Sequence, residues 1–424
     1  MQFSEFHQAL HAQYGEEAAA ARHELYFLAQ GRRFVLLYAV LAALRDAWLC
    51  WRLPRHATPV AAWAALATLP GSNGWGALAP CIADLGRRGI SCSVLIHPRL
   101  RGQVAGQLPA RPPASAWRHA LSAWRLRLSG ASSKPAVVSH WLVRCSLFRL
   151  RLWRGAWART LMACSGATLL LHNDFDLYAV AAQQGMGSGW RSLCVQHGLP
   201  TDEFFPLRAH SHMLWGPSSA QVYARHSIPA QVFGYGPERA SDLMSTAGLS
   251  APDTLYLVSQ THTPVYGCAL APQFLALAQA LAQMLPEGVA LRILLHPEEV
   301  RTGHPYASST VAAACCNPPH ALLEGGHTVT PALVVGFCST ALLQAACHGH
   351  YVIGMDWVAP ASIDAQAVGR PAMQVADAAA LCDLIGHLCN AVSARAAFFQ
   401  QQQQWLRRSF ACDGDWPQRL GSKA

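Results

Sequence analysis

The chain has 424 residues, of which 52% are hydrophobic and 13% are charged, a composition that excludes an intrinsically disordered protein. This length is too great for one ordinary hydrophobic core and suits two α/β domains with additional segments. The formal net charge is +9, almost all of it from arginine, because Lys134 and Lys423 are the only lysines. Such a surface suits phosphates, acidic glycans or an anionic membrane, but it also occurs without a specific partner. Nucleic acid is not an expected partner, because the arginines are dispersed and no nucleic-acid-binding motif is present.

The cysteines and the start of the chain predict a cytoplasmic protein. The 14 cysteines form no CxxC pair, and residues 1–31 carry acidic residues and no apolar run typical of a signal peptide. The cysteines are therefore expected to be reduced thiols. Cys347, His348 and His350 fit no standard zinc spacing, and neither a metal nor another cofactor is expected.

The first hundred residues predict a helical segment followed by the start of a doubly wound sheet. Residues 1–57 have a helical pattern, and the apolar run 34–44 is too short to span a bilayer, so it is expected to form a buried helix. The apolar stretch at 60–68 is a buried strand or a helix that leads into one. The elements predicted next are a Gly-rich turn at 71–76, a helix at 78–88 and a strand at 90–96. This order is typical of a parallel α/β sheet.

A basic, aromatic helix is predicted at 136–163, after a stretch at 101–135 that is expected to hold a loop and one amphipathic helix. The helix can lie on a membrane surface, or it can pack its aromatic residues in the core and solvate its arginines, and we favour the second arrangement. The α/β alternation then resumes with strands at 167–172, 192–196, 212–215 and 231–234 and a helix at 177–184.

The second half repeats this pattern after a polar stretch at 236–252. The predicted strands are 254–259, 290–295, 332–336 and 351–355, and the predicted helices are 274–284, 340–347, 376–389 and 394–410. The fold class is therefore α/β, with two Rossmann-like domains. The predicted divisions are a helical segment at 1–57, a first Rossmann-like domain at 58–240, a second at 241–390 and a helical tail at 391–424.

Two polar clusters follow predicted strands of the first domain, at the sheet edge where open α/β sheets bind ligands. They are Asn173, Asp174 and Asp176 after the strand at 167–172, and Gln196, His197 and Gly198 after the strand at 192–196. Asp174 or Asp176 can deprotonate a hydroxyl group, or the first cluster can simply cap the following helix. His197 can serve as an acid, a base or a phosphate partner, or it can be structural.

Two further clusters follow strands of the second domain. They are His296 and Pro297 after the strand at 290–295, and Gly336, Ser339 and Thr340 after the strand at 332–336. Hydroxyl groups at a helix N-terminus, beside free backbone N–H groups, form an anion site, although capping alone explains the same residues. The glycine spacing in the turn at 71–76 is not that of a dinucleotide site. Gly74 therefore marks either a close approach of the backbone to a ligand or an ordinary tight turn.

The order of the motifs adds information that no single motif carries. It consists of Asn-Asp-Phe at 173, Gln-His-Gly at 196, Trp-Gly at 215, His-Pro at 296 and Ser-Thr at 339. Over residues 160–360 it resembles the bacterial GT-B glycosyltransferases that build capsules and lipopolysaccharide, above all the sialyltransferase-like and Kdo-transferase-like groups, which use CMP-sugars. The resemblance implies two domains facing a central cleft. It also implies metal-independent, inverting transfer of an acidic sugar, such as sialic acid or Kdo, to a glycan or lipid-linked glycan, with peripheral contact to the inner face of an anionic membrane.

The resemblance also implies roles for the four clusters. Asp174 is expected to be the base, with Asp176 or His197 as the other choices. Cleft and acceptor positions are Asn173, Gln196, Gly198 and Gly74, and phosphate-binding positions are His296, Pro297, Gly336, Ser339 and Thr340. The chain departs from the family in lacking an Asp-Asp-Gly base motif and a clear acidic residue for the CMP ribose, although Glu324 and Asp356 are available.

Three other functions remain open. A CDP-glycerol-type polyol-phosphate transferase shares the core and would use His197 as its base, although such enzymes carry an Asp before the Ser pair, where this chain has Phe337 and Cys338. A nucleotide-sugar 2-epimerase needs a set of carboxylates and basic residues that we cannot assemble from the sequence. A non-catalytic assembly partner in a polysaccharide-synthesis complex is the alternative of another class.

Overall fold

A computed structural model describes most of the chain. It covers residues 3–30, 34–56, 60–68, 72–100, 110–111, 136–162, 168–226, 250–262, 267–316, 331–359, 362–411 and 416. The chain forms two compact units. Unit 1 comprises Met1–Gly198, Asp202–Met213 and Asp415–Ala424, and unit 2 comprises Leu199–Thr201 and Leu214–Gly414.

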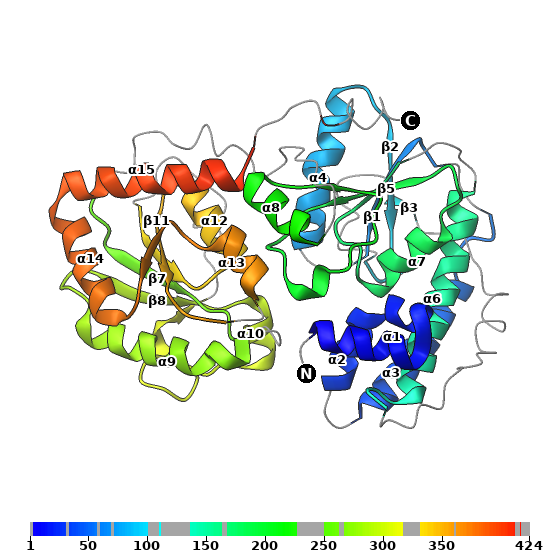
Figure 1. The fold of residues 1–424 in the computed structure, drawn as a ribbon, viewed down its shortest axis with the longest axis horizontal. Helices are drawn as coiled ribbons and strands as arrows, with labels where there is room; N and C mark the ends of the chain where they lie inside the picture. Colours follow the sequence, from blue (N-terminus) through cyan, green and yellow to red (C-terminus); the bar gives the residue numbers. More distant parts are fainter. Residues whose placement is uncertain are drawn as a thin grey trace. The chain divides into compact units, whose positions relative to one another are not determined.

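Unit 1 begins with three helices and continues as a parallel α/β sheet (Figure 1). Its helices are α1 (Phe3–Ala20), α2 (Arg22–Gln30), α3 (Val35–Trp51), α4 (Ser72–Arg87), α6 (His140–Leu161) and α7 (Leu177–Gly185), with short 3-10 turns at Pro98–Leu100 and Asp202–Phe204. Its strands are β1 (Trp63–Ala67), β2 (Cys92–Ile96), β3 (Ala110–Arg111), β4 (Thr168–Leu171), β5 (Arg191–Val195) and β6 (Ser211–Met213). The sheet order is β3-β2-β1-β4-β5-β6, and every pairing is parallel.

Burial on both faces explains why the strands of unit 1 are continuous apolar runs. In the register, Ala64 pairs with Leu169 and Leu66 with Leu171. Because side chains alternate along a strand, these four residues share one face, and they belong to the core formed with α1, α2, α3, α6 and α7. Ala65 and Leu170 are also buried and point to the other face, where α4 packs (Figure 1).

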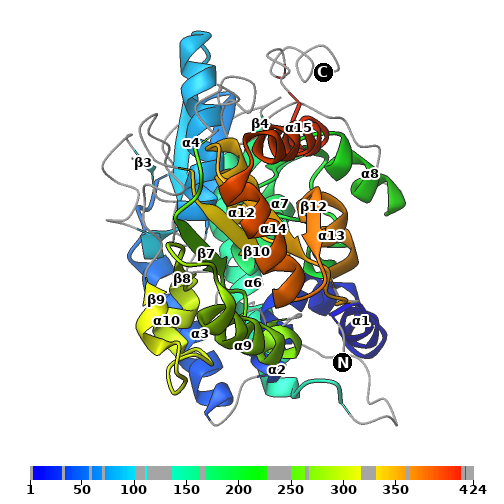
Figure 2. The ribbon, with the colours of Figure 1, turned by 90° about the vertical axis from the view of Figure 1, so that its left-hand side faces the viewer.

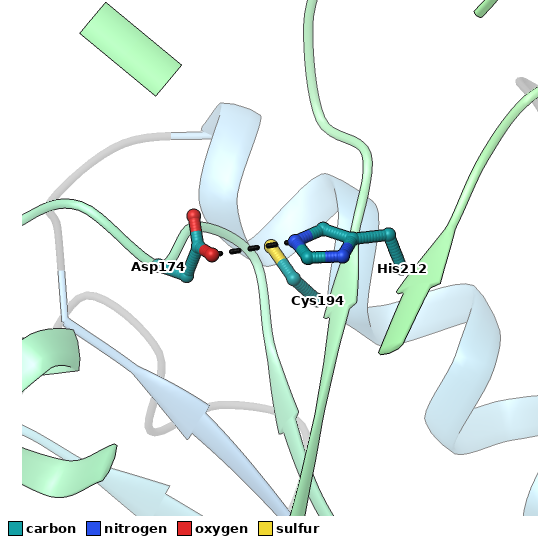
Figure 3. A group of neighbouring side chains, drawn as sticks. All are labelled: Asp174, Cys194 and His212. Carbon is teal, nitrogen blue, oxygen red and sulfur yellow. Dashed lines mark hydrogen bonds and ion pairs between the residues drawn. The ribbon is translucent and has the colours of Figure 1, made fainter. Parts of the chain in front are cut away.

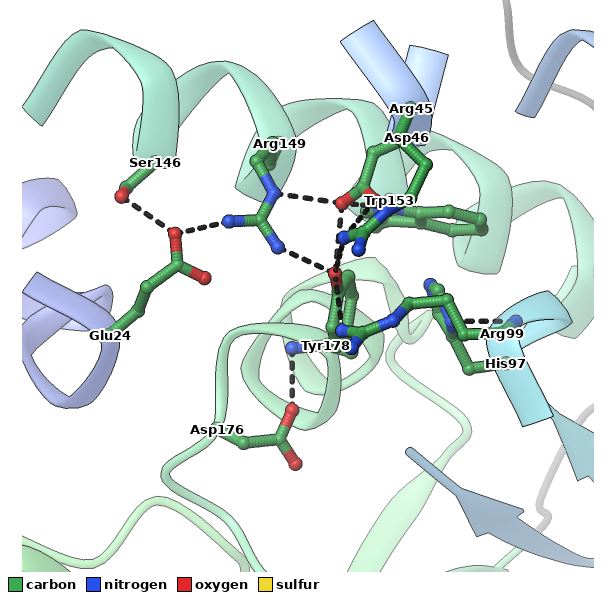
Figure 4. A network of polar contacts seen from close by, with 10 residues as sticks. All are labelled: Glu24, Arg45, Asp46, His97, Arg99, Ser146, Arg149, Trp153, Asp176 and Tyr178. Atoms are coloured by element: carbon green, nitrogen blue, oxygen red, sulfur yellow. Dashed lines mark hydrogen bonds and ion pairs between the residues drawn. The ribbon is translucent and has the colours of Figure 1, made fainter. Parts of the chain in front are cut away.

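A buried ionic network joins the helices of unit 1 (Figure 4). The Asp46 carboxylate of α3 accepts hydrogen bonds from Arg149 Nε (2.8 Å), Trp153 Nε1 (3.1 Å) and the Tyr178 hydroxyl (2.9 Å). Arg149 also pairs with Glu24 of α2. Burial disfavours the charged carboxylate, but the adjacent Arg149 outweighs it and holds the pKa of Asp46 below its usual value. The network therefore ties α2 and α3 to α6 and α7.

Unit 2 repeats the sheet order of unit 1. Its strands are β7 (Thr254–Val258), β8 (Ala290–Leu294), β9 (Cys315–Cys316), β10 (Leu333–Gly336), β11 (Tyr351–Met355) and β12 (Met373–Val375). They are all parallel, in the order β12-β11-β10-β7-β8-β9. Chain order and spatial order are related as in unit 1, so both units are doubly wound Rossmann-like folds. The predicted fold class is confirmed.

Helices surround the second sheet (Figures 1 and 2). They are α8 (Pro217–Arg225), α9 (Gly267–Met284), α10 (Pro297–Thr302), α12 (Thr340–Cys347), α13 (Ile363–Gly369), α14 (Ala378–Asn390) and α15 (Val392–Ser409), with a 3-10 turn at Ala312–Ala314. Helix α15 packs on α8, α12 and α14. The predicted strands at 254–259, 332–336 and 351–355 and the helix at 340–347 are confirmed within one or two residues. Among the residues described, no helix combines the length and hydropathy that crossing a membrane requires.

Three predictions about unit 1 are wrong. The Gly-rich stretch at 72–76 forms the first turn of α4 and not a separate turn, and Gly74 lets this turn approach the His172 ring at the sheet edge. Helix α3 is exposed along its larger apolar side chains, because its inner face is made of alanines. Arg149 is buried and not solvated, because Asp46 and Glu24 neutralise it.

Phe148, Trp153 and Trp157 of α6 are buried as we predicted, whereas Trp141, which was expected in the core as well, is 54% exposed. Other predictions fall outside the described residues. These are the helix and loop at 101–135 apart from β3, the strand at 231–234, the domain boundary at 240 and the position of Glu324.

Candidate functional site

In unit 1, three neighbouring strands bring polar residues to one edge of the sheet. The strands β1, β4 and β5 are adjacent and parallel, so the residues that follow them meet at the carboxyl edge. These residues are Thr68, His172 and His197. The edge thus combines the first two predicted clusters, the first of which begins at His172, with Thr68, for which no role was predicted.

His172 is a buried, neutral imidazole in the middle of this edge. Its Nε2 lies 3.4 Å from the Thr68 backbone nitrogen and 3.3 Å from Thr68 Oγ1, and its Nδ1 lies 3.1 Å from the Asn173 side-chain nitrogen. Burial lowers the pKa of His172 to about 3. Gly74 of α4 packs directly on the ring, since a Cβ there would lie 2.9 Å from His172 Cε1. The close approach predicted for Gly74 is therefore made to a side chain of the protein itself.

His197 is half-buried and lies against aromatic side chains. Its ring stacks on Phe204 with centroids 5.5 Å and planes 15° apart, and it meets His172 edge-on at 5.8 Å. Burial lowers the pKa of His197, and a hydrogen bond to the His172 backbone only partly opposes this. The Gln196 side chain donates to the Gly198 carbonyl oxygen (3.1 Å) and fixes the turn that carries the histidine. A neutral, partly exposed imidazole at this position can accept a proton.

Asp174 is 2% exposed, and its carboxylate lies beside His212 (Figure 3). Its Oδ2 accepts hydrogen bonds from the backbone N–H groups of Arg208 (2.5 Å) and Ala209 (2.8 Å) and lies 3.3 Å from His212 Nε2. Burial would raise the pKa of Asp174, but His212 and these donors hold it below its usual value. The carboxylate therefore anchors the loop before β6.

Cys194 joins Asp174 and His212 in a group whose ligand atoms all lie within 4.8 Å of one another (Figure 3). This donor set fits a metal poorly. Two backbone N–H groups already point at Asp174 Oδ2, and burial raises the pKa of the Cys194 thiol well above its usual value, which disfavours the thiolate that binds metals.

Asp176 and Asn173 organise the turn between β4 and α7. Asp176 is the N-cap of α7 and accepts from the backbone N–H groups of Tyr178 (2.7 Å) and Ala179 (3.1 Å) and from Thr68 Oγ1 (2.6 Å). Asn173 Oδ1 accepts from the Asp176 backbone N–H (3.0 Å). Both side chains are buried and hydrogen-bonded, the arrangement expected of residues that cap a helix.

In unit 2, the residues that follow β8, β7 and β10 meet at the carboxyl edge in the same way. His296 is the N-cap of α10, where its Nδ1 accepts from the Glu298 backbone N–H (3.1 Å) and Pro297 is the first helical residue. The buried Glu299 accepts from the His296 backbone N–H (2.8 Å), Ser259 Oγ (2.7 Å) and the Thr261 backbone N–H (2.7 Å). These donors hold the pKa of Glu299 below its usual value despite its burial. Glu299 thus fixes the ends of β7 and β8 relative to each other.

This arrangement stacks two imidazoles. The rings of His262 and His296 are parallel, with centroids 3.6 Å and planes 3° apart. Burial and the adjacent His296 lower the pKa of His262 to about 4, and burial lowers that of His296. His262 Nδ1 is buried and has no hydrogen-bond partner among the residues that the structure describes. Both rings are therefore neutral at pH 7, and a buried ring nitrogen is available to a ligand.

The residues after β10 form the third part of this edge. Ser339 caps α12 and accepts from the Ala341 backbone N–H (3.2 Å), and Thr340 is the first residue of the helix. Gln260, at the end of β7, binds both the backbone N–H (3.0 Å) and the carbonyl of Cys338. Gly336 leaves room for Leu342, since a Cβ would lie 3.2 Å from one of its methyl groups. The start of α12, where backbone N–H groups favour an anion, is thus held to β7, the strand that leads to His262.

The sequence predictions missed Gln260, His262 and Glu299. Gln260 and His262 follow the correctly predicted strand at 254–259. The rule that ligands bind at the carboxyl ends of parallel strands could therefore have identified them. Glu299 directly follows the predicted His-Pro-Glu, but its role depends on contacts with β7 that spacing does not reveal.

Comparisons with known proteins give structural likeness only. No family model matches the chain, and no curated protein matches its sequence. It is similar to the structure of a UDP-N-acetylglucosamine 2-epimerase, with 12% identity and a TM-score of 0.47, over 86% of this chain and 95% of that chain. It is also similar to CalG4, the calicheamicin glycosyltransferase, with 13% identity and a TM-score of 0.45, over 87% of this chain and 98% of that chain. A third similar structure is MurG of Acinetobacter baumannii, with 14% identity and a TM-score of 0.41, over 85% of this chain and 100% of that chain. At such identities the likeness concerns the fold alone.

Proposed function

We propose that the chain is a glycosyltransferase that moves a sugar from a nucleotide-sugar donor to a glycan acceptor. The observation that carries the proposal is the stacked pair His262–His296, at the same sheet edge as the N-terminus of α12. The order of the sequence motifs supports a CMP-linked acidic sugar, such as sialic acid or Kdo, as the donor. It also supports a role in capsule or lipopolysaccharide synthesis at the cytoplasmic face of the membrane.

Unit 2 would hold the donor phosphate. In the transfer, the acceptor oxygen forms a bond to the anomeric carbon as the bond from that carbon to the phosphate oxygen breaks, with inversion. Negative charge then grows on the departing CMP. His262 or His296 can donate a hydrogen bond to it, and the start of α12 adds the Ser339 and Thr340 hydroxyl groups and backbone N–H groups. These groups can stabilise the departing phosphate without a metal.

Unit 1 would supply the base that takes the proton of the acceptor hydroxyl. His197 suits this role better than the two carboxylates, because it is neutral and partly exposed. Asp174 and Asp176 are 2% and 3% exposed, and both already accept several hydrogen bonds. We therefore propose His197 as the base and Asp174 as the residue that holds the loop before β6.

The position of His197 at the sheet edge of unit 1 also favours a second function. A polyol-phosphate transferase of the CDP-glycerol type would also use a histidine at position 197 as its base. In that reaction the acceptor oxygen attacks the β-phosphorus and CMP leaves, so the donor is a CDP-alcohol and not a CMP-sugar. The two functions therefore differ in the nucleotide that the free protein should prefer.

The test is nucleotide binding followed by transfer. We would measure the melting temperature of the full chain with CMP, CDP, UMP, UDP and GDP, since a ligand specific for the folded state stabilises it. The variants His262→Ala and His296→Ala should lose the shift, whereas His387→Ala, an exposed histidine of α14, should keep it. Selective stabilisation by CMP supports the sugar transferase and stabilisation by CDP the polyol-phosphate transferase. A uridine preference, or no response to any nucleotide, would overturn the proposed donor.

A further inference from the structure

Helix α3 is amphipathic in the reverse sense to an ordinary surface helix. Its buried face, which packs on α6, consists of small or polar side chains, among them Ala39, Ala43 and Asp46. A surface helix normally buries its large apolar residues and exposes polar ones. In α3 the large apolar residues point outward, so packing within the described part of unit 1 does not account for them.

The outward face is a continuous apolar stripe. It consists of Leu37, Tyr38, Leu41, Leu44, Trp48 and Trp51. Spacings of three and four residues place these side chains along one side of the helix. Leu44 is 61% exposed and Trp51 is 65% exposed. An apolar stripe of this length on a protein surface marks an interaction site.

The charges around the stripe identify the kind of partner. The only acidic residue of α3 is Asp46, which is fully buried and paired with Arg149 and Arg45. At the C-terminal end, Arg52 and Arg55 are exposed, and the Arg52 guanidinium lies 4.6 Å from the centre of the Trp48 ring. In the sequence, Arg32 and Arg33 directly precede Phe34 and α3.

Leucines flanked by tryptophan and arginine are the side chains of helices that lie in a membrane interface, where aromatic rings sit at the headgroups and arginines meet anionic lipid. We propose that α3 lies flat in the surface of an anionic membrane. A helix of 17 residues is about 25 Å long and too short to span a bilayer, so it would lie parallel to the surface. The proposal places the membrane contact on α3 and not on α6, whose Trp153 and Trp157 are buried. It does not depend on the proposed transferase activity.

The test is sedimentation of the full chain with sucrose-loaded vesicles of phosphatidylcholine and phosphatidylglycerol in equal amounts, compared with phosphatidylcholine alone. The triple variant Leu37→Gln, Leu41→Gln, Leu44→Gln removes the apolar stripe at exposed positions and should keep the melting temperature. Its partition coefficient should fall by more than about tenfold. The matched control Met284→Gln, Ile363→Gln, Val392→Gln changes three exposed apolar residues of unit 2 and should bind like the unmodified chain.

The arginines are tested separately. Arg52→Gln and Arg55→Gln should each weaken binding to the mixed vesicles by about fivefold at low salt, and high salt should remove this difference. Equal partition of the triple variant and the unmodified chain would overturn the proposal. So would equal binding to both kinds of vesicle. Self-association through the stripe without vesicle binding would also overturn it, because the stripe would then be a surface between two copies.

Discussion

The rings of His262 and His296 lie face to face, 3.6 Å apart, at the ends of two adjacent strands of the second sheet. Glu299 holds this arrangement by accepting hydrogen bonds from the backbone N–H groups of Thr261 and His296. Burial disfavours a charge on either ring, and the two rings would repel each other if both were charged, so the pair is neutral at pH 7 without a ligand. An anion changes that balance, because it favours a protonated ring.

Nucleotide binding should therefore take up protons. A phosphate beside the pair raises the pKa of an imidazole that burial had lowered, so the affinity for CMP should increase as the pH falls from about 8 toward about 6, where the phosphate itself begins to protonate. Calorimetry in buffers of different ionisation enthalpy measures the number of protons taken up. The double variant His262→Asn, His296→Asn should bind weakly with no uptake. A pH profile shared by both proteins would contradict the assignment.

His97 should make the protein sensitive to acid. Its ring is fully buried between Trp153 (4.2 Å) and Tyr178 (4.0 Å), and burial lowers its pKa to about 3. Between the ordinary pKa of about 6.5 and this value, the unfolded chain binds the proton and the folded chain does not, so stability is lost as the pH falls through that window. His97→Phe keeps the ring stack and should reduce, but not abolish, the loss measured by urea unfolding at a series of pH values, because His172 and His262 also have lowered pKa values. Parallel curves for the two proteins would exclude His97 as the cause.

Two glycines of α4 should respond to alanine in opposite directions. Gly74→Ala places a Cβ 2.9 Å from His172 Cε1, and such overpacking should reduce the free energy of unfolding by about 1–3 kcal/mol. Gly76 lies in the same helix with nothing within 4 Å of a Cβ, so Gly76→Ala should increase it by about 0.5–1 kcal/mol. Urea unfolding measures both changes. Equal effects would mean that His172 moves away without cost.

Some of these relationships were readable from the sequence and others were not. The strands at 254–259 and 351–355 are continuous apolar runs between polar residues, and such runs predict buried parallel strands directly. Helix α3 was also predicted, but its orientation was not. Its alanines and leucines are all apolar, so periodicity does not reveal which set packs inward.

The error about Arg149 has a different cause. Arg149 was expected to be solvated because its neighbours in sequence suggest a surface, yet its partners Asp46 and Glu24 lie more than 100 residues away along the chain. The resemblance implied Asp174 as the base, and this stays a prediction, but the hydrogen bonds that Asp174 accepts from the backbone N–H groups of Arg208 and Ala209 depend on how β6 enters the sheet. Pairings over such sequence separations are set by the tertiary fold.

The buried network around Asp46 predicts a large loss of stability. Asp46→Ala leaves the Arg149 guanidinium, which is 4% exposed, without one of the two carboxylates that neutralise it, and should reduce the free energy of unfolding by about 3–5 kcal/mol (Figure 4). Glu16→Ala is the control, because Glu16 is largely exposed where it pairs with Arg208 and should cost about 1 kcal/mol or less. If urea unfolding gave similar losses for both variants, water would be solvating Arg149.

The identity of the base can be settled by separating activity from folding and nucleotide binding. His197→Asn should lower the transfer rate by about 10²–10⁴-fold, because the described residues of that edge offer no second neutral, partly exposed group to take the proton of the acceptor hydroxyl. The variant should leave the nucleotide-induced melting shift intact. Asp174→Asn should show the opposite pattern. It weakens the contact with His212 and the anchor of the loop at 208–209, so the melting temperature should fall while the folded fraction keeps most of its activity. If Asp174→Asn abolished transfer at an unchanged melting temperature and His197→Asn did not, the base would be Asp174, and its buried carboxylate would have to become exposed when the acceptor binds.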